Sequence, residues 1–377
     1  MNNEQLVKNE RNVGADIIRC LAFFLVVSVH FFLNSGYYYV AVEGPRMFVM
    51  TFMRNFSIIC VPLFMTLSGY LMRKKELSVK YYKKLGKTYL TYVLASVFCI
   101  SFSVIFLKEA FSIKKLLFSV LEFSGAPYSW YVEMYISFFL LVPFLNLIYN
   151  NIPSKRWKQF LVLVFIIITA LPSVVNAYNF SFTGGEWWHQ PSLSNAYQKI
   201  IPQWWTGIYP VTYYFIGSYL SEFKPKIKPF FNVLLIFVTT LISAAYSFWR
   251  SYKINFVWGD WCAYQSLFSV IITTLVFILF INISYTCFPK VITVLLKKMS
   301  SLCFGAYLLS WIFDSIFYPI LTERFPKATD CLFYYFLIVP AVFVCSLLLS
   351  YVLSKLQFLL EFACSFAAKK LTAKSKK

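Results

Sequence analysis

Charged residues are scarce in this chain: only 13% of its 377 residues are Asp, Glu, Lys or Arg, whereas 59% are hydrophobic and 21% are aromatic. A soluble protein of this length must cover its surface with polar atoms and cannot hide so much apolar side chain. Apolar runs of about 20 residues, the length that crosses a bilayer as a helix, recur along the sequence. The composition therefore excludes a soluble protein and predicts an all-α polytopic membrane protein.

Acidic residues are scarcer still, with 15 against 35 basic residues and a formal net charge of +20. A basic excess can mark a nucleic-acid-binding protein, but here the basic residues gather in short loops between apolar runs, as the positive-inside rule requires. With the N-terminus inside, 25 basic residues lie in inner segments and nine in outer loops. We therefore expect both termini to be cytoplasmic, with membrane lipids around the chain and no nucleic-acid partner.

The apolar runs predict about ten transmembrane helices. They divide the chain into a cytoplasmic leader (1–15), one transmembrane domain (16–354) and a basic cytoplasmic tail (355–377). No small-residue cleavage site follows the first run, so we interpret it as a retained helix rather than a signal peptide. The expected helices are 16–34, 47–72, 88–107, 131–149, 159–176, 205–221, 229–248, 263–285, 301–320 and 331–354.

Metal-binding patterns are lacking, since none of the nine cysteines forms a CxxC pair and the chain has two histidines, His30 and His189. Most of the cysteines lie inside apolar runs, where they act as small apolar side chains. We expect no metal or haem site. Cys262 and Cys331 are both expected near the outer face, which leaves a disulfide between them open.

The first apolar run, ADIIRCLAFFLVVSVHFF, nevertheless carries Asp16, Arg19 and His30. Ionisable groups inside a membrane are costly and mark candidate functional sites. His30 follows Arg19 by 11 residues, which is three helical turns plus about 20°, so both lie on one stripe with a rise of about 16 Å between them. The alternative role of His30 is a structural hydrogen bond between helices.

Three further ionisable groups, Arg54, Glu133 and Asp314, are expected in the outer half of the membrane, near the depth of His30. Charges in such a layer should pair with one another or line a wet cavity. The Trp-rich outer segments EWWHQP, PQWWTGIYP and VWGDW indicate either an aromatic belt or a carbohydrate platform. We interpret His189, in the first of them, as a loop residue.

On the inner side, Lys80, Lys84 and Lys87 are spaced so that they form one stripe leading into the third helix. The stripe is explained by the positive-inside rule alone or, with Arg19 beside it, by a polyanionic ligand arriving from the cytoplasm. The phosphates of a nucleotide-like cofactor are the obvious candidate.

These residues resemble the integral-membrane acyltransferase 3 family, especially the stand-alone O-acetyltransferases of bacterial surface polysaccharides. The first-helix signature of that family is an acid, an arginine and, after ten residues, a histidine, here Asp16, Arg19 and His30. Two departures are lysines at 84 and 87, where arginines are commoner, and Ser310, where many relatives have a histidine. Looser similarities lie in VPLFMTLSGYLMRKK, YYKKLGKTYL, SWYVEMYISFFLLVPFLN, YYFIGSYLSEFKPK and SLCFGAYLLSWIFD.

The resemblance implies a multi-pass protein of the bacterial plasma membrane that takes acetyl-CoA from the cytoplasm as donor and a hydroxyl of a polysaccharide or lipid-linked glycan as acceptor. It also implies that His30 is essential. Some relatives carry a fused extracytoplasmic hydrolase-like domain, and none is present in this sequence. We therefore expect the chain to deliver the acetyl group itself.

A mechanism follows as a hypothesis. Arg19, Lys84 and Lys87 hold the phosphates of acetyl-CoA, Asp16 holds Arg19, and the pantetheine arm follows the stripe of the first helix. His30 acts as general base or accepts the acetyl group itself, since imidazole titrates near neutral pH. Glu133 or Asp314 orients His30. Arg54 stabilises the oxyanion.

Two other classes of function remain open at this point: a glycan or lipid transporter with a charged substrate pathway, and a membrane scaffold for polysaccharide assembly without catalysis. The chain shows no internal repeat of the kind transporters carry. Residues 68–71, SGYL, are echoed by residues 217–220, GSYL, but the echo is too short to indicate duplication. Consumption of acetyl-CoA distinguishes an enzyme from both.

Overall fold

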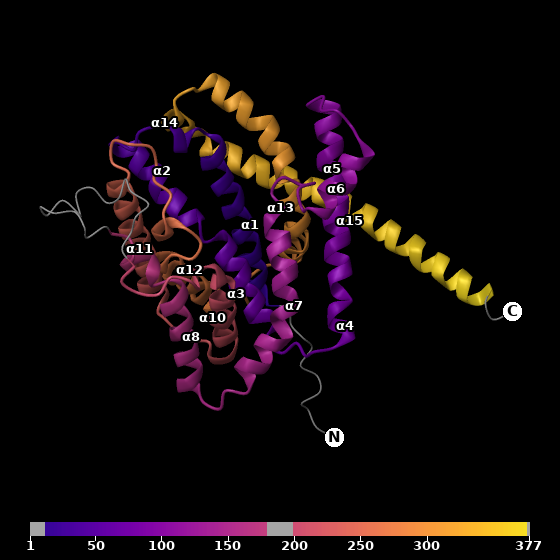
Figure 1. The fold of residues 1–377 in the computed structure, drawn as a ribbon, viewed down its shortest axis with the longest axis horizontal. Coiled ribbons are helices and arrows are strands. Elements are labelled where there is room, and N and C mark those ends of the chain that lie inside the picture. Colours follow the sequence, from indigo (N-terminus) through magenta and orange to yellow (C-terminus); the bar gives the residue numbers. More distant parts are fainter. Residues whose placement is uncertain (1–11, 179–198, 375–377) are drawn as a thin grey trace, which may run out of the picture.

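The helices form one bundle, with the C-terminal part of the last helix projecting from it (Figure 1). The computed structural model describes residues 12–178 and 199–374. Within those ranges there is no strand, and two isolated bridges, Ala41 with Asn255 and Val42 with Tyr252, are the β-type pairings. The elements are α1 (Val13–Asn34), η1 (Tyr37–Tyr39), α2 (Gly44–Ser57), α3 (Cys60–Met72), α4 (Val79–Tyr82), α5 (Lys84–Phe106), α6 (Ile113–Leu121), α7 (Trp130–Asn150), α8 (Lys155–Thr169), α9 (Pro172–Val175), η3 (Thr206–Ile208), α10 (Tyr209–Phe223), α11 (Pro229–Arg250), η4 (Asp260–Cys262), α12 (Leu267–Asn282), α13 (Lys290–Arg324), α14 (Ala328–Cys331), η5 (Leu332–Tyr334) and α15 (Tyr335–Lys374).

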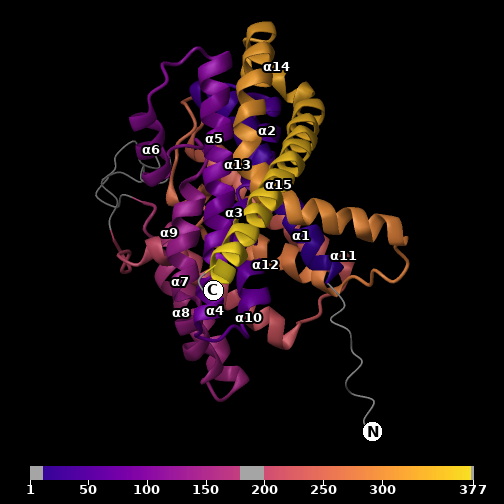
Figure 2. The ribbon, with the colours of Figure 1, turned by 90° about the vertical axis from the view of Figure 1, so that its right-hand side faces the viewer.

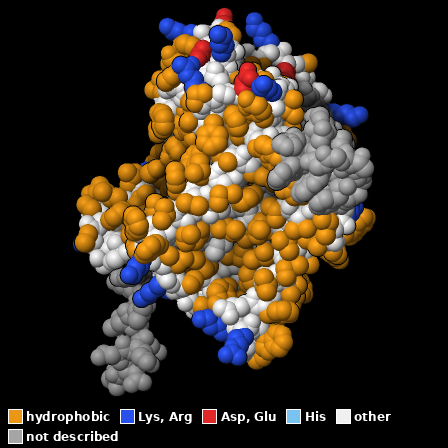
Figure 3. All heavy atoms as spheres, turned by 90° about the vertical axis from the view of Figure 1, so that its left-hand side faces the viewer, with side chains coloured by type: hydrophobic (Ala, Val, Ile, Leu, Met, Phe, Trp, Pro, Cys, Tyr) orange, Lys and Arg blue, Asp and Glu red, His pale blue; other side chains and the backbone are white. Residues whose placement is uncertain are grey.

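The prediction of an all-α polytopic membrane protein is confirmed. In the described part of the chain, nine helical segments are long and apolar enough to cross a membrane. The tenth expected segment, 205–221, is also helical, but α10 has only 15 residues. Hydrophobic side chains cover the middle of the molecule, and Lys and Arg gather toward two opposite ends (Figure 3). We call the side on which α1 begins the N-side and the side on which it ends the far side.

Several helices begin directly after capping side chains, which hydrophobicity alone does not locate. Asn12 Oδ1 accepts a hydrogen bond from the backbone N–H of Ala15 at 3.2 Å, so α1 begins at Val13 rather than at residue 16. Serines cap three other helices in the same way, because a hydroxyl oxygen satisfies an N–H of the first turn. They are Ser78 on α4, Ser154 on α8 and Ser266 on α12.

The expected helix 47–72 is broken into α2 and α3 at residues 58–59. Pro62 accounts for the break, because proline has no N–H for the carbonyl four residues earlier and its ring crowds that carbonyl. Cys60 and Val61, which follow the break, line the central cavity described below. A prediction based on hydrophobicity alone misses this interruption, since residues 44–72 together are long and apolar enough to cross a membrane as one span.

Two helices are longer than expected. The long helix α13 begins at Lys290, well before the expected start at residue 301. The last helix, α15, lies beside α13 and continues to Lys374, so most of the segment expected to be a tail (355–377) is helical (Figure 2).

The helices α3 and α10 pack with their backbones in contact through Gly69 and Gly217. A Cβ atom on Gly69 would overlap the backbone oxygen of Tyr214, and one on Gly217 would overlap the backbone oxygen of Thr66. Small residues allow such close approach between membrane helices, where lipid is as apolar as the protein and packing must supply the attraction. The echoed motifs of the sequence thus meet face to face.

Alanine at Gly69 or Gly217 should therefore separate α3 from α10. We expect each variant to lose roughly 1–3 kcal/mol of stability, the usual cost of forcing an extra carbon into a packed core. The measurement is the thermal unfolding midpoint of the purified protein in detergent. Gly86→Ala in α5 is the matched control, because a Cβ there meets no atom within 4 Å. Equal midpoints for all three variants would contradict the close packing.

Candidate active site

A cavity of about 410 Å³, here called the central cavity, lies between α1, α3, α5, α7 and α13. Its N-side end is lined by polar side chains, Arg19, Thr88, Ser300 and Ser301. Its deeper part is lined mainly by apolar and aromatic side chains. These are Val26, Val29, Cys60, Val61, Phe64, Leu67, Trp130, Tyr131, Tyr135, Tyr264, Cys303, Phe304 and Tyr307, with His30 among them.

Arg19 and His30 both line this cavity, which confirms that they share one face of α1. The Arg19 guanidinium donates a hydrogen bond to Ser300 Oγ at 2.6 Å and lies 3.5 Å from Asp16 Oδ1. Asp16 is buried, whereas the Arg19 side chain is 27% exposed. Asp16 and Ser300 thus both hold Nη1 of Arg19, while the guanidinium still lines the cavity.

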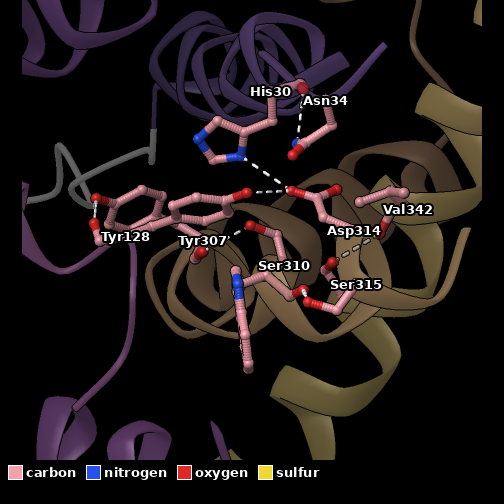
Figure 4. Close-up of polar contacts among 10 residues, drawn as sticks. His30, Asn34, Tyr128, Tyr307, Ser310, Asp314, Ser315 and Val342 are labelled. Carbon is pink, nitrogen blue, oxygen red and sulfur yellow. Dashed lines mark hydrogen bonds and ion pairs between the residues drawn. The ribbon is translucent and has the colours of Figure 1, made fainter. Parts of the chain in front are cut away.

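His30 pairs with Asp314 of α13 at the far end of the cavity. Nδ1 of His30 lies 3.3 Å from Oδ2 of Asp314, and both side chains are almost completely buried. The Tyr128 hydroxyl donates a hydrogen bond to the same Oδ2 at 2.8 Å. The rings of His30 and Tyr128 are also in contact, with centroids 3.7 Å apart and planes tilted by 35°. Figure 4 shows the imidazole and the Tyr128 hydroxyl converging on this carboxylate.

The surrounding hydrogen bonds fix the backbone at this pair. Tyr307, on α13, donates from its hydroxyl to the carbonyl of Tyr128, and Ser310 donates to the carbonyl of Tyr307 at 2.8 Å. Asn34 donates to the carbonyl of His30 at 2.8 Å. Ser310, the position at which many relatives have a histidine, therefore has a backbone partner within α13.

The arrangement suits an imidazole that exchanges protons. Nδ1 lies at ion-pair distance from Oδ2 without the angle of a hydrogen bond, and a proton on Nδ1 leaves the lone pair on Nε2. The second ring nitrogen of His30 points away from Asp314 (Figure 4). The same carboxylate stabilises the imidazolium once Nε2 has taken a proton.

The other predicted site residues lie outside the cavity lining. Glu133, the alternative partner of His30, is exposed, so the pairing falls to Asp314. Lys84 and Lys87 are exposed at the start of α5, and Nζ of Lys87 lies 3.8 Å from Oε2 of Glu361. Thr88, the residue after Lys87, lines the N-side end of the cavity, whereas neither lysine does.

Arg54 is completely buried and is engaged elsewhere. It donates to the carbonyl of Cys262 at 2.6 Å and to the Tyr38 hydroxyl at 3.1 Å. Its guanidinium also lies over the rings of Phe256 and Trp258. Since Arg54 does not line the central cavity, the structure does not bring it to His30 as an oxyanion donor. Instead it ties α2 to the far-side segment that precedes α12.

Sequence reasoning missed Tyr128, Tyr307 and Ser300. The chain contains 27 tyrosines, so a single tyrosine gives no signal by type. The available signal for Tyr128 is its position two residues before the Trp-aromatic-Glu segment at the start of α7. Ser300 has none, because its role depends on α13 lying beside α1.

The eight cysteines whose side chains are described are free, so the disulfide left open between Cys262 and Cys331 is not formed. In the described ranges, no group of three or more His, Cys, Asp or Glu side chains is placed to hold a metal ion. Trp187, Trp188 and His189 lie outside the described residues.

The fold and this site define a multi-pass membrane protein with a buried His–Asp pair at the end of a narrow cavity. A family model described as an acyltransferase domain matches residues 12–355, which is nearly the whole chain. The chain therefore belongs to the acyltransferase 3 family and is a membrane acyltransferase. No curated protein and no solved structure matches it.

Asp314→Asn tests the pair without changing the shape of the site. The amide no longer stabilises an imidazolium, so we expect acyl transfer to slow by about 10²–10⁴-fold. The KM for the acyl donor should stay near that of the wild type. The measurement is steady-state transfer by the purified protein.

Asp330→Asn is the matched control, since Asp330 pairs with Arg46 on the exposed far side at 2.7 Å. Full activity of Asp314→Asn would show that the carboxylate has no part in the reaction.

Proposed function

We propose that the protein transfers an acetyl group from acetyl-CoA to a hydroxyl of a surface or exported polysaccharide, from its place in the bacterial plasma membrane. The observation that carries the proposal is the central cavity, which joins the cation Arg19 at its mouth to His30 at its far end. An acyl donor with a charged head and a thin arm fits this shape. The acyltransferase family supplies the reaction class.

The N-side is the cytoplasmic side in this proposal. The short basic loops that begin and end the helices lie there, including residues 73–87 with seven Lys and Arg. The positive-inside rule therefore favours entry of the donor from the cytoplasm.

The residues present fit acetyl-CoA. Arg19 offers a guanidinium at the mouth, where phosphates bind well to planar donors, and Lys84 and Lys87 add charge beside it. Beyond Arg19 the walls are mainly apolar and aromatic, and Ser68 and the tyrosines among them offer hydroxyl groups to the amides of a pantetheine arm. Arg19 and His30 are separated by about 16 Å along α1, a distance that this arm can span.

His30 acts as the general base in the transfer. Its Nε2 takes the proton of the acceptor hydroxyl while the hydroxyl oxygen forms a bond to the thioester carbonyl carbon. The carbon–sulfur bond then breaks, and the proton on Nε2 passes to the sulfur that leaves with CoA. Asp314 stabilises the imidazolium between these steps. No oxidant, metal ion or further co-reactant is needed for this balance.

A glycan acceptor rests on the resemblance of the first-helix signature to polysaccharide O-acetyltransferases. The buried base agrees with it, because a sugar hydroxyl is a weak nucleophile until its proton is removed. A transporter needs no such pair beside a closed cavity, and it would leave acetyl-CoA intact.

His30→Ala should abolish acetyl transfer from radiolabelled acetyl-CoA while the amount of protein in the membrane stays unchanged. The other histidine provides the control, and we expect His189→Ala to retain activity. Acid quenching of the wild-type reaction should leave no acetyl label on the protein, since the base carries only a proton. Activity retained by His30→Ala would end the proposed mechanism.

Arg19→Gln should raise the KM for acetyl-CoA by roughly ten- to a hundredfold, the value of one charge-assisted hydrogen bond. Acetyl-pantetheine, which lacks the nucleotide phosphates, should be used equally well by the variant and the wild type. Arg156→Gln, at an exposed position of α8, is the matched control. A raised KM for both donors would assign Arg19 a structural role instead.

A further inference from the structure

A second cavity lies on the opposite side of the His–Asp pair. This far-side cavity has a volume of about 360 Å³ and lies between α1, α13 and the segment before α7. Asp314 lines it, whereas His30 lines the central cavity. The pair therefore separates the two spaces. The other lining residues are Asn34, Tyr128, Trp311, Ser315, Tyr318, Pro319 and Thr322.

The far-side cavity is polar for a space between membrane helices. Amide and hydroxyl groups come from Asn34, Ser315 and Thr322. Asp314 and Tyr318 are each 3% exposed, and Asp314 Oδ1 and the Tyr318 hydroxyl have no hydrogen-bond partner among the described residues. A buried polar atom without a partner is unfavourable unless a water molecule or a ligand group satisfies it. The amide, hydroxyl and carboxylate groups of this lining favour a ligand that carries hydroxyl groups rather than a lipid chain.

A smaller cavity of about 160 Å³, the loop cavity, adjoins the far-side cavity at Trp311, which lines both. It lies between α5, α6 and the segments on either side of α6. Its polar lining consists of Ser103, Glu109, Ser112, Ser119 and Ser124. The two spaces thus present hydroxyl and carboxylate groups on either side of one indole.

We infer that the far-side cavity and the loop cavity form one groove that binds a segment of at least two sugar residues of the acceptor, with Trp311 between the two positions. This inference rests on the proposed function and gives its acceptor a place. Sugars combine hydroxyl groups, which suit the serines and carboxylates, with apolar ring faces, which suit an indole. The sugar in the far-side cavity is the one that is acetylated, because Asp314 lines that cavity.

Tyr128 stands between this groove and the base. It lines the far-side cavity, contacts the His30 ring and donates from its hydroxyl to Asp314 Oδ2. Nε2 of His30 faces the central cavity, so an acceptor hydroxyl that comes from the groove reaches it once the Tyr128 side chain has moved aside from the imidazole and from Asp314. Tyr128 precedes α7 and belongs to no helix, so this movement of its side chain would unwind none.

The test uses the purified full-length protein and de-O-acetylated surface polysaccharide of the producing strain, cut into mono- to tetrasaccharide fragments. We expect disaccharides and longer fragments to raise the thermal unfolding midpoint, because a ligand that binds only the folded state stabilises it. The monosaccharide should have a smaller effect. Trp311→Ala should lower the apparent affinity for the longer fragments about tenfold and raise their KM in acetyl transfer by a similar factor.

Trp311→Phe keeps an aromatic ring and should recover most of this loss, which separates stacking from general damage to the fold. Trp204→Ala, at an 89% exposed position that lines neither cavity, is the matched control. The groove would be refuted if the fragments left the unfolding midpoint of the wild type unchanged, or if they raised the midpoint of Trp311→Ala by the same amount. Either result would count even where acetyl transfer proceeds. A shift that depends on Trp311, without any consumption of acetyl-CoA, would support the groove and refute the proposed reaction.

Discussion

The carboxylate of Asp314 is the group around which the site is organised. A carboxylate in an apolar interior is strongly disfavoured unless donors surround it. Oδ2 has the imidazole of His30 at 3.3 Å and the hydroxyl of Tyr128 at 2.8 Å. These groups come from α1, from α13 and from the segment before α7. Pairing one charge therefore fixes three elements and sets the wall between the central and far-side cavities.

Two arginines, Arg54 and Arg19, meet the same requirement in different ways, and the difference separates a structural cation from one that can bind a ligand. Arg54 is surrounded by a carbonyl, a hydroxyl and two aromatic rings, and it lines no part of the central cavity. Arg19 is held by Asp16 and Ser300 at one edge and still faces open space. A cation completely surrounded by the protein stabilises a loop. One that faces a cavity is placed to bind an anion.

Local geometry explains what the sequence predicted well. Apolar runs give the helices, and the rise of one helix places Arg19 and His30 on one stripe. The choice of Asp314 over Glu133, the role of Tyr128 and the separation of Arg54 from His30 depend on how distant segments pack. Tyr128 and Asp314 are 186 positions apart in sequence, and no periodicity within either segment reports their contact. Pro62 is a helix breaker that the sequence shows, but the expected helix 47–72 follows the apolar run across it.

The contact between Gly69 and Gly217 makes one wall of the central cavity rigid. With their backbones touching, α3 and α10 move as a single body. Asn146 of α7 joins them at the N-side through its bonds to the carbonyl of Met72 at 2.9 Å and to the Tyr214 hydroxyl at 2.6 Å. Among the described residues, the opposite end of α7 makes no hydrogen bond to this body and is tied to α13 instead, through the bond from the Tyr307 hydroxyl to the carbonyl of Tyr128. The helix α7 therefore connects the rigid wall at the N-side to the His–Asp pair at the far side.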